Sequence, residues 1–295
     1  RVSNFFHYFS YNFEKLKLKK LITTCYKNQS VDLFSKYDKE KAISLEYDGD
    51  KNNNKIPDLE EIGVKYLKGD GDFRSDECIE LLKQADIVVT NPPFSLFRPY
   101  VSQLIEYKKK FVIIGHVNGI TYKETFKFIK EKKMWLGHSI KSGDREFQVH
   151  DSYKLSSKSQ RVVDGKKYVR VPGIRWFTNL DYKERYENLD LYKKYSPKEY
   201  LKYDNYDAIN VDKTKDIPED YDGVMGVPIT FMDKYKPDQF DILGITSGRD
   251  EFEARPTKRY INPIQINEDG SKTNGSKANT RATLRWNKKP KGTYY

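Results

Sequence analysis

The sequence has few cysteines, no cysteine motif and no long apolar segment, and each shortage removes a class of protein. Only two of the 295 residues are cysteine, and Cys25 and Cys78 lack the C-x-x-C spacing of a zinc or redox site. No apolar run approaches the roughly eighteen residues needed to cross a bilayer, and no secretory signal is present. We therefore expect a cytoplasmic globular protein that has no contact with a membrane.

Histidine is also scarce. The four histidines form no local cluster, and packing or hydrogen bonding explains each of them better than catalysis does. No serine or cysteine has the sequence context of a nucleophile elbow. The chemistry of the chain must therefore be sought in other residue types.

Basic charge, in contrast, is abundant. The formal net charge is +11 and the pI is near 9.2. Residues 249–295 hold 11 Lys or Arg against 5 Asp or Glu, an excess of 11 − 5 = 6. This concentration favours a polyanionic partner, although a lysine-rich surface without a partner is the alternative. The candidate DNA contacts lie in a loop-like stretch that could also be a solvated charged loop, and they are Arg249, Arg255, Lys258 and Arg259.

Strand and helix patterns alternate over about the first 140 residues, which is typical of an α/β protein with a doubly wound parallel sheet. The expected helices cover residues 3–16, 75–84, 96–107 and 121–132, and the expected strands cover residues 18–26, 41–47, 64–68, 85–90, 110–115 and 134–139. Ser3 is a suitable N-cap for the first helix.

The pattern changes after Ile140. Residues 146–150, 168–171 and 174–179 predict short strands that form an antiparallel edge of the sheet. From about Asp181 the chain is rich in tyrosine and punctuated by proline, with weak periodicity. We therefore expect a catalytic domain over residues 1–180 and a second, smaller target-recognition domain over residues 181–295.

A rare turn follows the strand at residues 85–90. It reads Asn91-Pro92-Pro93-Phe94, and its two prolines form a stiff corner that can join neither a sheet ladder nor a helix interior. The Asn91 side chain and the Pro92 carbonyl offer hydrogen-bond acceptors, and Phe94 offers a flat apolar face. These groups suit a planar molecule with an exocyclic NH₂ group, although a purely structural loop is the alternative.

This corner resembles the (Asp/Asn/Ser)-Pro-Pro-(Tyr/Phe/Trp) motif of amino-methyltransferases that use S-adenosylmethionine. Longer segments resemble the adenine-specific methyltransferase family named for the EcoRI modification enzyme, and the likeness covers most of the chain. These segments are Lys68-Gly-Asp-Gly-Asp72-Phe73-Arg-Ser-Asp-Glu, residues 85–97, Gly173-Ile-Arg-Trp-Phe-Thr-Asn179 and Tyr221-Asp-Gly-Val-Met-Gly-Val-Pro-Ile-Thr230.

The resemblance implies a Rossmann-like domain that methylates the N6 amine of an adenine flipped out of duplex DNA. Asn91 and the Pro92 carbonyl would accept hydrogen bonds from N6, and Phe94 would stack on the base, with Pro93 fixing the turn. The biological setting would be restriction and modification, with a cognate restriction endonuclease encoded nearby. We expect a monomer.

The resemblance also places the adenine of S-adenosylmethionine against Asp72 and Phe73, one strand before the corner. Asp72 could accept from the adenine amine while Phe73 packs on the purine, with Asp70 as the competing acceptor and Asn91 on the cofactor side. A turn aspartate beside a core phenylalanine would give the same pattern.

The chain departs from the family pattern at its start, where the first strand and its Gly-rich loop are missing. The strand ending at Tyr26 also lacks the acidic residue that usually holds the ribose. We therefore expect an incomplete N-terminus. Methylation of another amine, such as an RNA base or a protein glutamine, is one alternative function, and a degenerate DNA-binding homologue without catalysis is another.

A separate polar segment has the spacing of a calcium loop. Oxygen side chains occupy relative positions 1, 3, 5, 9 and 12, although Lys55 stands where a glycine is expected. A solvated turn is the favoured interpretation, with a structural calcium site as the second hypothesis. Its ligands would be Asp50, Asn52, Asn54, Asp58 and Glu61.

Overall fold

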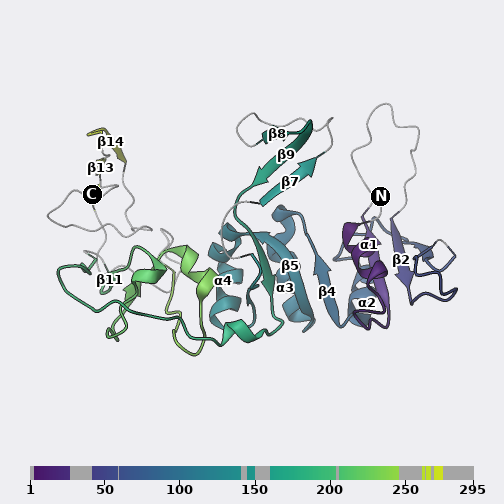
Figure 1. Ribbon diagram of the computed structural model, residues 1–295, viewed down its shortest axis with the longest axis horizontal. Helices are drawn as coiled ribbons and strands as arrows, with labels where there is room; N and C mark the ends of the chain where they lie inside the picture. Colours follow the sequence, from purple (N-terminus) through teal and green to yellow (C-terminus); the bar gives the residue numbers. More distant parts are fainter. Residues whose placement is uncertain are drawn as a thin grey trace. The chain divides into compact units, whose positions relative to one another are not determined.

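The computed structural model combines helices with both parallel and antiparallel strands, which confirms a mixed α/β protein (Figure 1). The chain divides into two compact units, residues 1–113 and residues 114–295. None of the helices described is both long enough and apolar enough to cross a membrane. The structure describes residues 3–26, 42–58, 60–140, 145–149, 160–203, 206–245, 261–262, 264–266 and 269–274.

The first unit begins with a helix that packs on a three-stranded sheet. Helix α1 (Asn4–Tyr11) starts at Ser3, as predicted, because the Ser3 side chain accepts a hydrogen bond from the Phe5 amide at 3.2 Å. The sheet has the order β1-β2-β3, with β1 at Leu21–Cys25, β2 at Ile43–Tyr47 and β3 at Gly63–Tyr66. The core of this part consists of Phe6, Phe13, Leu45 and Tyr47.

All three of these strands pair antiparallel, which corrects the prediction of a parallel sheet over the first 140 residues. Between β2 and β3 the described residues form a polar loop without a helix. Parallel strands need a crossover of a dozen or more residues, usually helical, whereas a loop that simply reverses the chain gives antiparallel pairing.

The predicted helix and strand alternation is confirmed in the second half of this unit. Helix α2 (Asp76–Gln84) begins at its N-cap Ser75 and carries two acidic residues in its first turn, which suits the helix dipole. Strand β4 (Ile87–Thr90), helix α3 (Phe97–Glu106) and strand β5 (Lys110–His116) follow, with the short 3-10 helix η1 (Phe94–Leu96) before α3. β4 and β5 pair in parallel, so α3 is the crossover helix.

The second unit contains the end of β5 and the elements that follow it. Strand β10 (Ile174–Thr178) lies between β5 and β6 (Trp135–Leu136) in the order β4-β5-β10-β6, and β10 and β6 pair antiparallel. Of the three strands predicted for an antiparallel edge, β10 joins the sheet, whereas β7 and β9 form a separate antiparallel sheet with β8, in the order β7-β9-β8. The remaining elements are η2 (Val117–Thr121), α4 (Lys123–Lys130), β7 (Arg145–Val149), β8 (Gln160–Val163), β9 (Lys166–Val171), η3 (Lys183–Arg185), β11 (Ile209–Asn210), η4 (Thr214–Asp216), β12 (Met225–Gly226), η5 (Ile229–Lys234), β13 (Ile264–Ile266) and β14 (Lys272–Asn274).

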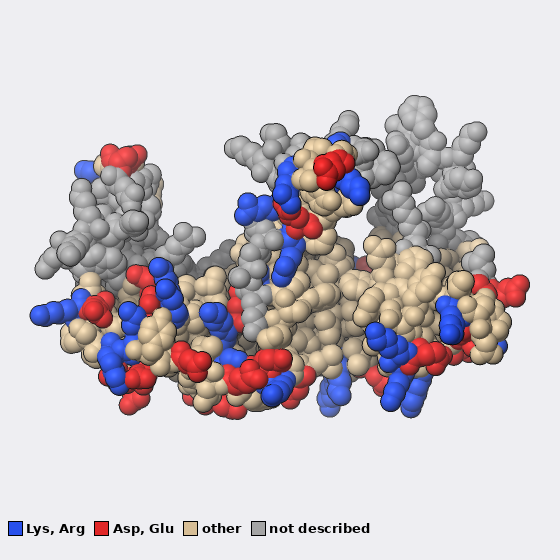
Figure 2. Space-filling view, viewed as in Figure 1, with Lys and Arg blue, Asp and Glu red and all other residues tan. Residues whose placement is uncertain are grey.

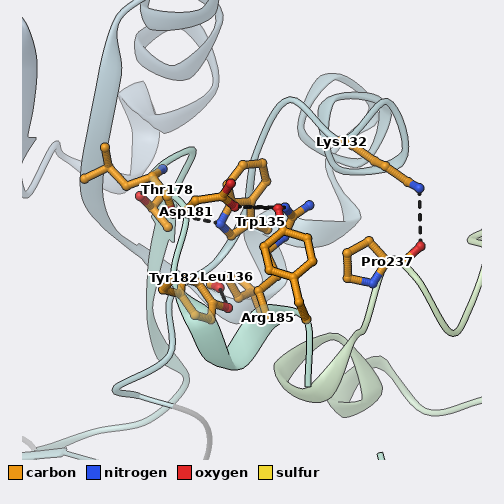
Figure 3. Close-up of polar contacts among 10 residues, drawn as sticks. Lys132, Trp135, Leu136, Thr178, Asp181, Tyr182, Arg185 and Pro237 are labelled. Carbon is orange, nitrogen blue, oxygen red and sulfur yellow. Dashed lines mark hydrogen bonds and ion pairs between the residues drawn. The ribbon is translucent and has the colours of Figure 1, made fainter. Parts of the chain in front are cut away.

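The segment after β10 folds back onto β6, and polar contacts to backbone carbonyls hold it there (Figure 3). Trp135 Nε1 donates to the Leu180 carbonyl at 3.1 Å, and the Tyr182 hydroxyl donates to the Leu136 carbonyl at 2.7 Å. The Arg185 guanidinium lies 3.6 Å from the centre of the Trp135 ring, which is close stacking for a cation on an indole. Further along, a small core of Tyr200, Ile209, Val211, Ile217 and Phe231 supports β11 and η5.

A buried ion pair joins β10 to η5. Arg175 Nε donates to Asp233 Oδ1 at 2.6 Å and Arg175 Nη2 donates to Asp233 Oδ2 at 2.8 Å. Each of the two side chains is only 5% exposed. The two-pronged geometry satisfies both carboxylate oxygens, which such a pair needs to offset the cost of losing water.

Replacing Asp233→Asn leaves the Arg175 guanidinium buried without a counter-charge. We expect the free energy of unfolding to fall by about 3–5 kcal/mol, measured by urea unfolding followed by circular dichroism. Asp207→Asn is the matched control, because Asp207 pairs with Lys202 at 3.4 Å but is 86% exposed. Equal losses of unfolding free energy in the two variants would show that burial does not determine how much an ion pair contributes to stability.

Candidate active site

The Asn91-Pro92-Pro93-Phe94 corner lies at the carboxyl end of β4, where the sequence predicted it. Asn91 is exposed, Pro92 is buried, and the Phe94 ring keeps 46% of its surface exposed. Pro93 has φ −53°, and its carbonyl accepts from the Leu96 amide at 2.9 Å, which starts η1. The corner therefore presents an amide side chain and an aromatic ring at a fixed turn between a strand and a helix.

Phe73 connects the segment after β3 to the helix that follows this corner. Its ring meets the Tyr100 ring of α3 edge-on, with centroids 4.8 Å apart and an angle of 65°. Its carbonyl accepts from Gln103 Nε2 of the same helix at 3.0 Å. Burial raises the pKa of Tyr100 to about 12, so its hydroxyl stays protonated near neutral pH. Two contacts thus join the predicted cofactor segment to the helix that follows the predicted catalytic corner.

Asp72 is held by its own neighbour, Arg74. Asp72 Oδ1 accepts from the Arg74 backbone amide at 2.8 Å and from Arg74 Nε at 2.9 Å. Asp72 Oδ2 accepts from Arg74 Nη2 at 2.6 Å. These hydrogen bonds lower the pKa of the Asp72 carboxyl to about 2. The Arg74 guanidinium also lies 5.3 Å from the centre of the Phe73 ring.

The Asp70 carboxylate accepts fewer and weaker hydrogen bonds than the Asp72 carboxylate does. Its Oδ1 accepts from the Asp72 amide at 2.9 Å, and its Oδ2 lies 3.5 Å from the Tyr26 hydroxyl, a weak contact. Between the two aspartates, Gly71 has φ +81°, and a Cβ there would lie 3.0 Å from the Cys25 carbonyl oxygen. Glycine is therefore required at position 71, both for its backbone conformation and for its close approach to the end of β1.

Arg74, Tyr100 and Gln103 were missed as site residues by sequence reasoning. Arg74 stands two residues after Asp72, which is a detectable signal for a local ion pair. Tyr100 and Gln103 are three residues apart on α3 and so share a helix face, but only the fold shows that this face meets Phe73.

The calcium hypothesis is not supported. The part of the chain that the structure describes contains no group of three or more His, Cys, Asp or Glu side chains that could hold a metal. The predicted ligands instead bind the loop's own amides: Asp50 accepts from Asn54 N and Lys55 N, Asp58 from the side-chain amides of Asn52 and Asn54, and Glu61 Oε1 from Lys51 N and Asn52 N.

One oxygen of that loop, Glu61 Oε2, is buried and has no hydrogen-bond partner among the described residues. A single acceptor is far from the six to eight oxygens that calcium takes. The described part of this segment is therefore a polar turn whose carboxylates bind amides of the same loop.

The predicted DNA contacts cannot be placed in the same way. Arg249, Arg255, Lys258 and Arg259 lie outside the described residues.

Comparison with known proteins relates nearly the whole chain to one family. The family model for the adenine-specific methyltransferase EcoRI matches residues 1–291. No solved structure matches the chain.

Three curated relatives are similar over most of their length. The type II methyltransferase M.EcoRI of Escherichia coli is 51% identical over 254 residues, which is 85% of this chain and 77% of the relative. M.MpnI of Mycoplasma pneumoniae is 41% identical over 246 residues, or 82% of this chain and 70% of the relative. M.MgeORF184P of Mycoplasma genitalium is 40% identical over 247 residues, or 82% of this chain and 71% of the relative.

Replacing Arg74→Gln removes the cation that holds Asp72. We expect the pKa of the Asp72 carboxyl to rise from about 2 toward the ordinary value of 3.8, measured by carbon NMR titration of the carboxyl groups. The folded-state pKa is lowered, so the pair stabilises the fold above about pH 3.8, and this contribution is lost as pH falls toward 2. Lys83→Gln is the control, since Lys83 pairs with Glu80 instead. If Arg74→Gln left the pKa of Asp72 unchanged, Arg74 would not be the cause of the lowered pKa.

Proposed function

Because the chain belongs to the EcoRI family of adenine-specific methyltransferases, we propose that Asn91, Pro92, Pro93 and Phe94 form the centre that methylates adenine. The protein is a type II DNA methyltransferase of a restriction-modification system. The observation that carries the residue assignment is the exposed Asn91 at the carboxyl end of a strand, with the half-exposed Phe94 ring three residues later.

The residues of the corner act on the target amine by hydrogen bonding and stacking. The Asn91 side-chain oxygen and the Pro92 carbonyl accept from the N6 amine of an adenine that has left the duplex. These acceptors concentrate the nitrogen lone pair on N6 and orient it for attack. Phe94 offers an aromatic surface for the base, and the rigid prolines keep the acceptors in place because their rings fix φ.

Membership of the family implies S-adenosylmethionine, which supplies the methyl group from a sulfonium centre when it is bound. The residues after β3 fit the adenine of that molecule in their chemistry. Phe73 is half-buried, and Asp70 Oδ2 meets only the weak donor Tyr26 among the residues that the structure describes. Asp72 is already engaged by Arg74, which favours Asp70 as the acceptor and Asp72 as the residue that braces Arg74 beside Phe73. Asn91 would border the same space from the corner.

The wider organisation completes the proposal. We expect the catalytic part to be Rossmann-like, with β4, α3 and β5 as one of its strand-helix-strand units. Residues 1–180 would form the catalytic domain and residues 181–295 the target-recognition domain, in which Arg249, Arg255, Lys258 and Arg259 contact duplex DNA. A cognate restriction endonuclease would cut the same site in unmodified DNA. We propose a monomer that works in the cytoplasm, where its DNA substrate lies.

The test of the function is transfer of a tritiated methyl group from S-adenosylmethionine to duplex DNA. Asn91→Ala should lower the turnover rate by about 100-fold or more, because one preorganised acceptor of the reacting amine is lost, and should leave the affinity for DNA unchanged. Ser95→Ala is the matched control, since Ser95 is exposed and directly follows the corner. Turnover by Asn91→Ala within about threefold of the unmodified enzyme, or transfer to RNA or protein alone, would refute the proposal.

The roles of Asp70 and Asp72 can be distinguished by the affinity of variants at each position for S-adenosylmethionine, measured by calorimetry. Asp70→Asn should weaken binding by about tenfold, because a charged acceptor of the adenine amine becomes a neutral one. Asp72→Asn should have a smaller effect, since the Asp72 oxygens already bind Arg74. The reverse order would make Asp72 the direct acceptor.

A further inference from the structure

The sheet of β7, β9 and β8 has no buried residue among its described side chains. Phe147 is 49% exposed and Val162 is 62% exposed, and the other described side chains are exposed or half-buried. A two-residue turn at Asp164-Gly165 joins β8 to β9, with positive φ at both positions, as in a tight hairpin turn. Among the described residues, neither face of this sheet is therefore buried in the way that a sheet covering a core would be.

Strand register decides which side chains share a face of this sheet. Arg161 lies opposite Tyr168, and Glu146 lies opposite Arg170, so all four point to the same side as Lys166. This cationic face is defined by Arg161, Val163, Lys166, Tyr168 and Arg170 with Glu146 and Gln148, and its described residues carry three cations and one carboxylate. Figure 2 shows basic side chains with acidic ones among them on this sheet.

One ion pair crosses the cationic face. Arg161 of β8 passes over the Tyr168 ring of β9, with its guanidinium carbon 5.9 Å from the ring centre, and its Nη2 donates to Glu146 Oε2 of β7 at 2.6 Å. The Arg161 side chain is nevertheless 62% exposed and the Glu146 side chain 37% exposed. Arg161 is thus oriented by Glu146 and Tyr168, yet it remains accessible to solvent or to a partner.

We propose that this cationic face contacts the phosphate backbone of the duplex DNA substrate. The inference rests on the function as a DNA methyltransferase and adds a binding surface to it. Charge complementarity selects the partner, because exposed Lys and Arg on a face with one carboxylate suit a polyanion.

The two members of the Glu146–Arg161 pair provide opposite predictions. Arg161→Gln removes a cation from the contact, so the dissociation constant for a labelled duplex of random sequence should rise about three- to fivefold. The slope of log affinity against log salt should become shallower by about 0.9. Among the described residues of the face Glu146 is the one acid, so Glu146→Gln removes its repulsion of phosphate and binding should tighten by about twofold. Lys166→Gln, at the other end of the hairpin, should weaken binding as Arg161→Gln does.

The opposite changes in DNA affinity expected for Arg161→Gln and Glu146→Gln distinguish a DNA contact from a structural role of the ion pair. Both pair variants break the same ion pair, so a pair that only stabilises the sheet would affect thermal unfolding similarly in both and leave DNA affinity alone. Lys65→Gln is the matched control, because Lys65 and Glu46 form an exposed pair between neighbouring antiparallel strands at 2.9 Å in the other unit. We expect no change in DNA affinity for this control.

Methyl transfer by the unmodified protein separates this proposal from the function on which it rests. If the unmodified protein methylates duplex DNA while Arg161→Gln and Lys166→Gln bind it normally, the cationic face does not contact DNA. If the unmodified protein does not methylate duplex DNA at all, the proposed function itself fails. Opposite shifts for Arg161→Gln and Glu146→Gln, with normal folding of both, support the contact.

Discussion

Strands β4 and β5 pair in parallel, and a parallel pair obliges the chain to cross back before the second strand can begin. Helix α3 makes that crossing, so the turn between β4 and α3 must lie at the carboxyl end of the strand. Parallel sheets place ligands at this end. The Asn91-Pro92-Pro93-Phe94 corner occupies that turn, and its position therefore follows from strand pairing as much as from its own residues.

The same helix also determines where the preceding segment goes. Phe73 is fixed to α3 by its ring contact with Tyr100 and by the hydrogen bond from Gln103. Arg74 then holds Asp72 and approaches the Phe73 ring. A helix that starts at the corner thus orders the groups proposed to bind S-adenosylmethionine, which couples the two halves of the site through one rigid element.

Sequence reasoning predicted what depends on local chemistry. Helix α1 was predictable from its Ser3 cap, helix α2 from its amphipathic pattern, and the corner from its two prolines. The direction of β1, β2 and β3 was not, because it depends on how the loops between them turn. The contact of Tyr100 and Gln103 with Phe73 was also beyond reach, since it joins segments about thirty residues apart. The exposed sheet of β7, β8 and β9 was partly missed because β8 has no alternating pattern.

Gly71 makes the placement of two carboxylates depend on a position that carries no side chain. The absence of a Cβ lets the turn between the two aspartates touch the end of β1, so a substitution at this position would push that turn away from β1. Asp70 and Asp72 flank this glycine, so both carboxylates would shift together. A change at position 71 would therefore disturb the whole acidic segment while leaving each acidic residue in place.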